Sequence, residues 1–239
     1  NLARDSFYSE QNFADGFVQL KDITPTRITS LQKIQGIKEI EGRLVKDVTI
    51  QKPNADDHIT LKLISFDNQT GNSINRPRLH LGETLQDNEP ELWIDNKFFE
   101  VHQLVLGDQL ELIINGRKQK FAIKGVVSSP EFVYALKDEA SVFPDPDTFG
   151  IAFISWNTMK KFFSDTNYFN ELVFTLEIGG DYDLVAEELK LRLAPHGLTR
   201  IYPREEQSSH FLLNKELVSL DAMTTSIPIL FLGIASMVL

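Results

Sequence analysis

The histidine side chains have the greatest potential for metal or acid–base chemistry, but their spacing supports neither. The chain has five of them, and no two stand at the H-x-x-x-H spacing that puts two imidazoles on one helix face. They are dispersed over the sequence as His58, His80, His102, His196 and His210. We therefore expect no metal site, and a structural role for His196 at the negative end of a helix dipole.

Motifs for nucleophiles and for phosphate binding are absent as well. The chain contains no cysteine, which excludes a thiolate nucleophile, a thiolate zinc site and a disulfide framework. Ser128-Ser129-Pro130 is typical of a loop between a strand and a helix, without a base nearby in the sequence. Gly179-Gly180 precedes a helix, but Asp181 and Asp183 follow and suit a helix cap better than an anion site. We predict no catalytic residue, no cofactor and no enzymatic activity.

The net charge argues against nucleic-acid binding, and the length limits the number of domains. The chain has 24 Lys and Arg against 34 Asp and Glu, a net charge of −10, so it has no excess of basic residues to bind a phosphate backbone. The 239 residues suit one large domain or two small ones.

Two groups of aromatic residues allow different interpretations. Helical spacing and neighbouring strands make most of them core residues, including the group 162–169. Phe132, Val133 and Tyr134 have a second interpretation, as an exposed loop that contacts a partner protein, because aromatic residues are enriched at interfaces.

Helices and strands alternate near both ends of the sequence. Residues 24–36 predict a short amphipathic helix between a strand at 17–20 and a strand region at 37–50 with a turn near 41–42. Residues 58–66 predict another strand. The pattern from 148 to 204 is strand, helix, strand, helix, strand, with the first helix capped by Asn157 and the second beginning at Asp181 or Asp183.

The middle of the chain has mainly strand signals. ELWIDNKFF (91–99) predicts one strand, and Asn115-Gly116 between two apolar runs predicts a hairpin. Loops or linkers are expected at 67–78 and at 141–147. We therefore predict an α+β fold in which a split α/β lobe, residues 13–66 and 148–204, carries an inserted β-rich lobe, residues 67–147.

The last part of the sequence, residues 205–239, predicts a helix that runs into an apolar segment. Residues 227–239 contain no charge, and they are fewer than the roughly 20 residues that span a bilayer. We expect the start of a membrane span, and a sequence that is part of a longer protein.

Three segments together resemble the extracytoplasmic (MacB-like periplasmic core) domains of FtsX-like, MacB-like ABC transporter permeases. LGDQLELIINGRKQKFAIKGVVSSPEFVY (106–134) is similar to their G-D-x-L-x-L…F-x-V-x-G-V…S-P-x-F-V-Y run. Residues 14–50 resemble the opening of the domain, where GI-x-x-x-EGR follows the first helix. NELVFTLEI (170–178) is similar to the strand after the return crossing.

This resemblance implies a domain between the first and second spans of a multi-pass permease in the cell membrane. It implies a porter lobe with an inserted sabre lobe, and stalks at residues 1–12 and 205–239 that transmit motion. The expected partners are a cytoplasmic ABC ATPase, a second permease chain in a homodimer or heterodimer, and an accessory extracytoplasmic protein. The domain would couple ATP hydrolysis to movement of a peptide, lipoprotein, antibiotic or similar substrate. The alternative is a docking platform that recruits and activates a partner such as a cell-wall hydrolase.

Overall fold

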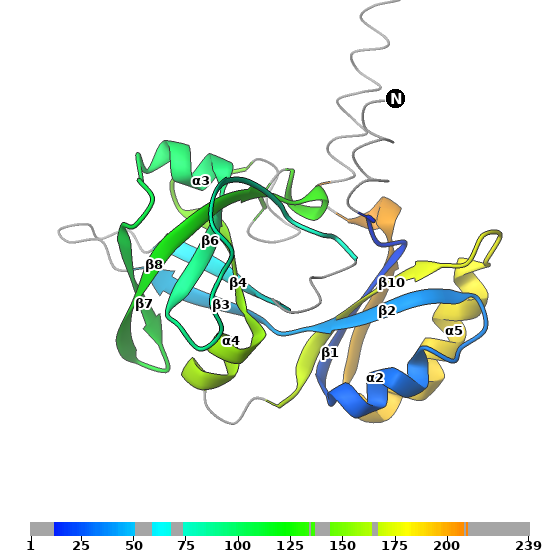
Figure 1. Cartoon of the computed structure of the whole chain (residues 1–239). Helices are drawn as coiled ribbons and strands as arrows, with labels where there is room; N and C mark the ends of the chain where they lie inside the picture. The colour runs from blue at the N-terminus through cyan, green and yellow to red at the C-terminus, as the bar shows by residue number, and fades with distance from the viewer. Residues whose placement is uncertain are drawn as a thin grey trace, which may run out of the picture.

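The strands of the chain form two sheets that lie side by side (Figure 1). The computed structural model describes residues 12–50, 59–67, 74–133, 135–136, 144–163, 167–207 and 209. The chain begins a four-stranded sheet, leaves it to build the whole of a seven-stranded sheet, and then returns to complete the first.

The four-stranded sheet has helices on one face and antiparallel neighbours throughout, in the order β11-β1-β10-β2. Its strands are β1 (Gly16–Ile23), β2 (Ile37–Arg43), β10 (Phe169–Leu176) and β11 (Leu198–Pro203). Helix α2 (Pro25–Leu31) connects β1 to β2, and helix α5 (Tyr182–Leu193) connects β10 to β11. This is the β-α-β-β-α-β arrangement of ferredoxin-like folds. Both helices bury their apolar side chains in one cluster with the strands.

The seven-stranded sheet closes on itself. Its order is β5-β8-β6-β9-β4-β3-β7, and β7 also pairs with β8. Its strands are β3 (Val45–Ile50), β4 (Ile59–Phe66), β5 (Arg78–Gly82), β6 (Glu91–Asp95), β7 (Gln109–Ile114), β8 (Arg117–Ser128) and β9 (Phe149–Ser155). The first half of β8 pairs with β7 and its second half with β5. All strands except β5 therefore form a closed barrel, and each of them contributes to one buried apolar cluster.

One buried carboxylate caps a short helix of the barrel and ties it to a strand. Asp95 ends β6 and is 9% exposed. Its Oδ1 accepts a hydrogen bond from the backbone N–H of Phe98 at 3.0 Å, and its Oδ2 accepts one from the backbone N–H of Ile151 at 3.0 Å. It thus caps helix α3 (Asn96–Val101) and also ties α3 to β9. The strand predicted over 91–99 is wrong beyond Asp95, because this cap starts a helix there.

Other local predictions are confirmed in part. The hairpin at Asn115-Gly116 is confirmed, with φ of 49° and 75° as a type I′ turn requires. Asp181 is the cap of α5, accepting from the backbone N–H groups of Asp183 and Leu184. The first helix is shorter than the predicted 24–36 and covers Pro25–Leu31.

Two further local predictions are wrong. Helix α4 (Trp156–Phe162) is capped by Ser155 and not by Asn157, because the Ser155 hydroxyl accepts from the backbone N–H of Thr158 at 3.1 Å. No turn occurs at 41–42, because β2 continues to Arg43. Gly42 serves close packing instead, since a Cβ there would lie 2.3 Å from the Phe169 ring.

The lobe boundaries predicted at 66/67 and 147/148 do not match the sheet topology. Strands β3, β4 and β9 belong to the barrel, so the chain changes from one sheet to the other at Leu44 and returns after α4. β9 and β10 flank α4 but lie in different sheets. The reason is that alternation of strand and helix predicts the elements but not the partner of each strand.

The predicted stalks and membrane span lie largely outside the described residues. Residues 1–11, 208 and 210–239 are not described, and Arg204–Glu206 forms one 3-10 turn. Parts of the expected linkers at 67–78 and 141–147 also lie outside. Over the described ranges, no helix is both long and apolar enough to cross a membrane.

Candidate functional site at the junction of the two sheets

The chain crosses between the sheet and the barrel at two points that are bonded to each other. Leu44 alone separates β2 from β3, and its side chain is fully buried. Its backbone N–H donates to the Ser65 hydroxyl at 2.8 Å, and its carbonyl accepts from the Ser65 N–H at 2.9 Å. At the return crossing, the Asn170 amide accepts from the Val45 N–H at 2.8 Å and donates to the Val45 carbonyl at 2.9 Å. The crossing geometry is therefore fixed by hydrogen bonds.

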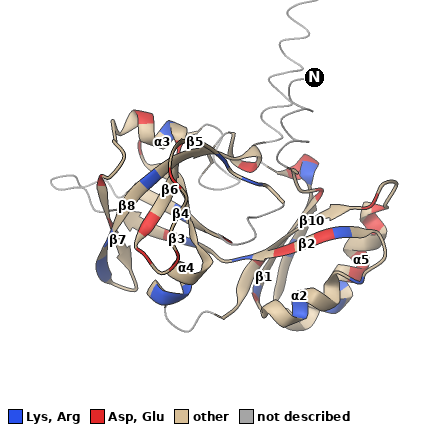
Figure 2. Cartoon of the chain, viewed as in Figure 1, with Lys and Arg blue, Asp and Glu red and all other residues tan. Residues whose placement is uncertain are grey.

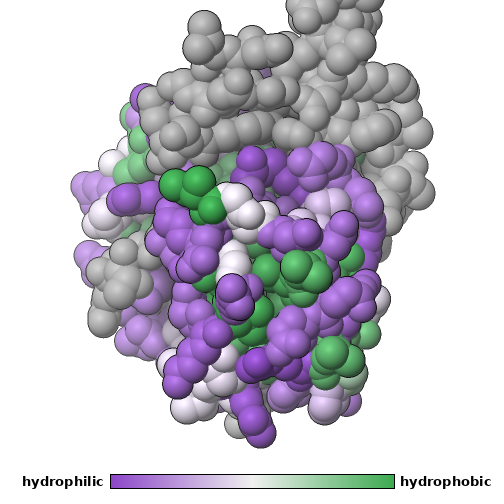
Figure 3. All heavy atoms as spheres, turned by 90° about the vertical axis from the view of Figure 1, so that its right-hand side faces the viewer, coloured by the Kyte–Doolittle hydropathy of each residue, from purple (hydrophilic) through white to green (hydrophobic). Residues whose placement is uncertain are grey.

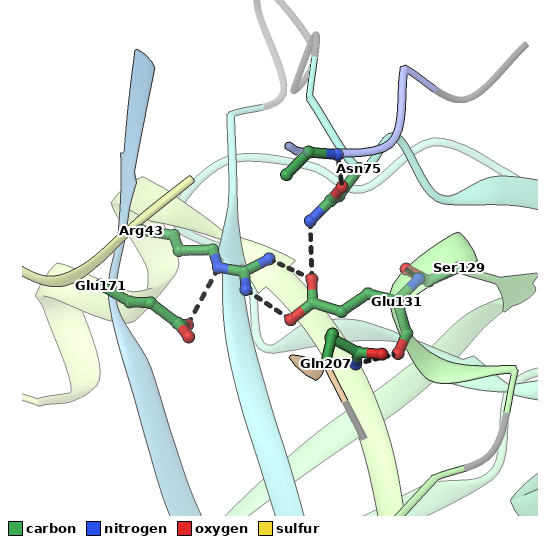
Figure 4. Close-up of polar contacts among 7 residues, drawn as sticks. Arg43, Asn75, Ser129, Glu131, Glu171 and Gln207 are labelled. Atoms are coloured by element: carbon green, nitrogen blue, oxygen red, sulfur yellow. Dashed lines mark hydrogen bonds and ion pairs between the residues drawn. The ribbon is translucent and has the colours of Figure 1, made fainter. Parts of the chain in front are cut away.

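A buried arginine lies beside these crossings. Arg43, the last residue of β2, is 4% exposed. Its two terminal nitrogens donate to the carboxylate of Glu131, each at 2.6 Å, and its Nε donates to Glu171 at 3.0 Å (Figure 4). Glu171 faces Arg43 across the β10–β2 pair, whereas Glu131 comes from the 3-10 turn η1 (Pro130–Phe132) that follows barrel strand β8. The guanidinium thus joins the two units.

Two further segments bind the same glutamate. Asn75 donates to the Glu131 carboxylate at 2.9 Å and accepts from the Ala14 N–H at 2.7 Å. Gln207 donates from its side chain to the Glu131 carbonyl at 2.6 Å. Figure 4 shows these side chains converging from separate elements. The segment before β1 and the segment after β11 are therefore both tied to η1.

Arg204 ties these two segments to each other. Its guanidinium donates to the carbonyls of Phe13 and Ala14 at 2.5 and 2.7 Å, and forms an ion pair with Asp15 at 2.6 Å. It also lies 5.1 Å from the centre of the Phe13 ring. Arg204 thus holds the segment before β1 and the segment after β11 together.

The cluster holds one more buried carboxylate than it has buried cations. Burial raises the pKa of Glu171, and the attraction of Arg43 opposes that rise. Burial alone would lower the pKa of Arg43, but its attraction to Glu131 and Glu171 outweighs this effect and raises that pKa. Arg43 is therefore permanently charged, and it holds the two carboxylates of the cluster in place.

We expect Glu171→Gln to stabilise the protein at neutral pH, on the order of 1 kcal/mol, because it removes the excess buried charge and still accepts from Arg43. A raised pKa means that the folded state binds the proton more tightly, so wild type gains stability as pH falls through that pKa. The advantage of the variant should shrink over the same window and vanish below the ordinary glutamate pKa. Urea unfolding from pH 8 to pH 4 measures it. Glu188→Gln, at an exposed pair, is the control and should show no such window.

The predicted partner-contact residues 132–134 begin at the last residue of η1, directly after Glu131. Phe132 is half-buried and packs against the apolar cluster on the outer face of the barrel, and Val133 is 37% exposed. Both line a pocket of about 480 Å³ together with His80 and Asp95. Tyr134 lies outside the described residues, so a contact through 132–134 stays a prediction.

The histidines are not brought together among the described residues. His80 Nε2 lies 2.8 Å from the Ser128 hydroxyl, in an exposed pair between β5 and β8. His102 Nε2 lies 3.0 Å from the carbonyl of Pro146, and His196 ends the turn after α5. His58 and His210 lie outside the described ranges. Where the chain is described, no three His, Asp or Glu side chains converge as metal ligands.

Sequence reasoning missed Arg43 and Glu131 as a site, although both lie in segments that carry the family resemblance. The available signal was a charged residue directly before an apolar one, since Leu44 follows Arg43 and Phe132 follows Glu131. Such a charge needs a buried partner. Glu131 is 88 positions further along the chain, and the sequence gave no indication that it was this partner.

Comparisons with family models and with curated proteins return no match. Among solved structures, the extracellular domain of the ABC-type transporter YknZ from Gram-positive bacteria matches at 17% identity and a TM-score of 0.49, over 80% of this chain and 98% of that one. The periplasmic region of MacB from Actinobacillus actinomycetemcomitans matches at 13% identity and a TM-score of 0.49, over 84% and 92%. At these identities and TM-scores the function must be argued from the residues of this chain.

Proposed function

We propose that this chain is a non-enzymatic extracytoplasmic domain of an ABC transporter permease, which carries motion driven by a cytoplasmic ATPase to a substrate outside the membrane. The observation that carries the proposal is the double attachment of Glu131. The segments at 12–15 and at 203–207 are clamped together by Arg204, and both are bonded to η1 of the barrel. A displacement of these segments is therefore passed to both the sheet and the barrel.

The charge distribution supports the same class. Figure 2 shows, for the described residues in this view, basic residues among acidic ones over both units, and the net charge of −10 disfavours nucleic acid as a partner. The sequence contains no phosphate-binding loop, so nucleotide hydrolysis would belong to a separate ATPase subunit or domain. The permease would act as a homodimer or heterodimer, with the peptide, lipoprotein, antibiotic or similar substrate moved outside the membrane.

The test uses the full-length protein purified from membranes in mild detergent. We expect an ABC ATPase subunit to copurify. Lys118 is exposed and lies in a chain segment without cysteine, so Lys118→Cys can carry a single fluorophore in this segment. After reconstitution, a lipid-attached quencher in the outer leaflet should quench this fluorophore. The degree of quenching should depend on the bound nucleotide. An ATPase without its catalytic glutamate, loaded with ADP only, is the control and should give no change. Failure to recover an ATPase overturns the proposal.

The docking platform remains a second candidate because of one observation. Val133 is exposed at the mouth of an apolar-lined pocket on the barrel, as a platform for a cell-wall hydrolase or another accessory protein would require. The quenching experiment separates the two functions. Recovery of an ATPase together with unchanged quenching would contradict substrate movement and favour the platform.

A further inference from the structure

The turn between β10 and α5 presents aliphatic side chains that the core does not use. Ile178 in this turn is fully exposed, while Leu184 and Leu191 on α5 are 71% and 74% exposed. Figure 3 shows the face of the molecule that carries α5 and this turn, where apolar side chains lie among polar ones. We call the residues Ile178, Leu184 and Leu191 the α5 surface.

The α5 surface is separate from the packing side of the helix. The buried side of α5 consists of Val185, Ala186, Leu189 and Leu193, which contact the sheet. Leu184 and Leu191 stand seven residues apart, two helical turns, and so lie on one outward side about 10 Å from each other. A row of this spacing along a helix is what a second helix packs against.

The turn holds Ile178 in a fixed position. The Gly180 N–H donates to the carbonyl of Glu177 at 2.8 Å, and the Glu177 N–H donates to the carbonyl of Gly36 at 2.9 Å. Gly179 has a φ of +78°, which favours glycine and lets the chain reverse immediately after Ile178. Because the backbone is already ordered, binding here costs little conformational entropy.

A hollow of about 630 Å³ adjoins the exposed residues. Ile178, Leu184 and Ile34 line it, together with charged side chains that include Glu177, Asp181 and Lys33. This volume accommodates several side chains of a bound segment. The hollow therefore offers both apolar and charged groups beside the exposed leucines.

The charges around the α5 surface define its partner. Glu177, Asp181 and Asp183 lie close to Ile178 in the sequence, and no basic residue occurs between 177 and 189, while Lys33 and Arg192 line the hollow. Glu187 and Glu188 are already bonded to Lys190 and Arg192, at 2.6 Å each. The net charge of −10 disfavours a second copy of this acidic chain as the occupant.

We propose that the α5 surface binds a basic amphipathic helix of another protein, with aliphatic side chains against Ile178, Leu184 and Leu191 and Lys or Arg opposite Glu177, Asp181 and Asp183. Capping of α5 accounts for Asp181 and favours Asp183 at the helix N-terminus, but it explains neither Ile178 nor the two leucines. The proposal concerns a binding partner and goes beyond the coupling function, on which it does not depend.

The first test uses the full-length protein in nanodiscs and two synthetic helical peptides. Both peptides carry leucine on one face, and the flanking charges are lysine in one and glutamate in the other. We expect only the lysine peptide to bind, with an affinity reduced about tenfold or more by Ile178→Asp. Leu81→Asp, at another exposed leucine on β5, is the matched control and should leave the affinity unchanged. Equal effects of the two substitutions, or binding of both peptides, would overturn the proposal.

The second test identifies the natural occupant. A photo-crosslinking amino acid at Leu184 in the full-length protein in membranes should form a crosslink to a segment with aliphatic and basic residues at helical spacing, read by mass spectrometry. The crosslink should be lost with Glu177→Lys combined with Asp183→Lys. A crosslink to lipid, to a second copy of the chain or to no protein contradicts it. Neither test uses ATP or an ATPase, so failure here leaves the permease proposal intact.

Discussion

Glu131→Ala is expected to lower the free energy of unfolding by about 3–5 kcal/mol, because it leaves the buried Arg43 without its bidentate partner. Both side chains are about 5% exposed or less, so water cannot replace the lost contacts. Glu131 also accepts from Asn75, which would lose its acceptor in the same variant. Urea unfolding followed by tryptophan fluorescence measures the difference from wild type.

The matched control is Glu188→Ala, which removes an arginine partner at a surface pair with side chains 45% and 41% exposed. That loss should stay below about 1 kcal/mol. Glu131→Gln keeps the hydrogen bonding partly intact and supplies a milder variant if Glu131→Ala does not fold. Adding Arg43→Met together with Glu171→Gln should recover part of the loss, because no buried charge is then left unpaired. Similar losses for Glu131→Ala and Glu188→Ala would show that the buried pair does not hold the junction.

Asp95→Ala is expected to lower the free energy of unfolding by about 2–4 kcal/mol. Two buried backbone N–H groups, of Phe98 and Ile151, lose their acceptor at once, and each unsatisfied donor costs about 1–3 kcal/mol. Thermal unfolding monitored by circular dichroism, together with hydrogen exchange at the two amides, measures the effect.

The control for this variant is Asp181→Ala, which removes the exposed cap of α5 and should cost about 1 kcal/mol. Asp95→Asn retains one acceptor oxygen and should fall between the two. If the Ile151 amide exchanged no faster in Asp95→Ala than in wild type, Asp95 would not be the link between α3 and β9.

Local signals in the sequence predicted elements well where one residue decides the conformation. Asn115-Gly116 needs positive φ at both positions and so predicts its hairpin, and Asp181 predicts the start of α5. The split of the chain by an inserted β-rich unit was predicted as well. Asp95 carried the same kind of signal, but the strand-forming residues before it concealed the start of α3.

The pairing of distant segments could not be read from local patterns. β4 lies parallel to β9 after a separation of about ninety residues, and alternation of apolar residues is the same in either sheet. The same holds for Arg43 and Glu131, because a charge reveals its need for a partner but not the partner's position. Phe132 was predicted as a contact residue because it is aromatic. In the structure it is half-buried and packs against the apolar cluster on the outer face of the barrel.

The bond between Val45 and Asn170 has a consequence for the ancestry of this molecule. It places the departure and the return of the barrel side by side, so the ferredoxin-like sheet could be closed by a short hairpin between β2 and β10. A domain whose two ends are adjacent can be inserted, lost or exchanged without a change in the fold of the domain that carries it. We therefore expect proteins with the same four-stranded sheet to carry different inserted domains at this position.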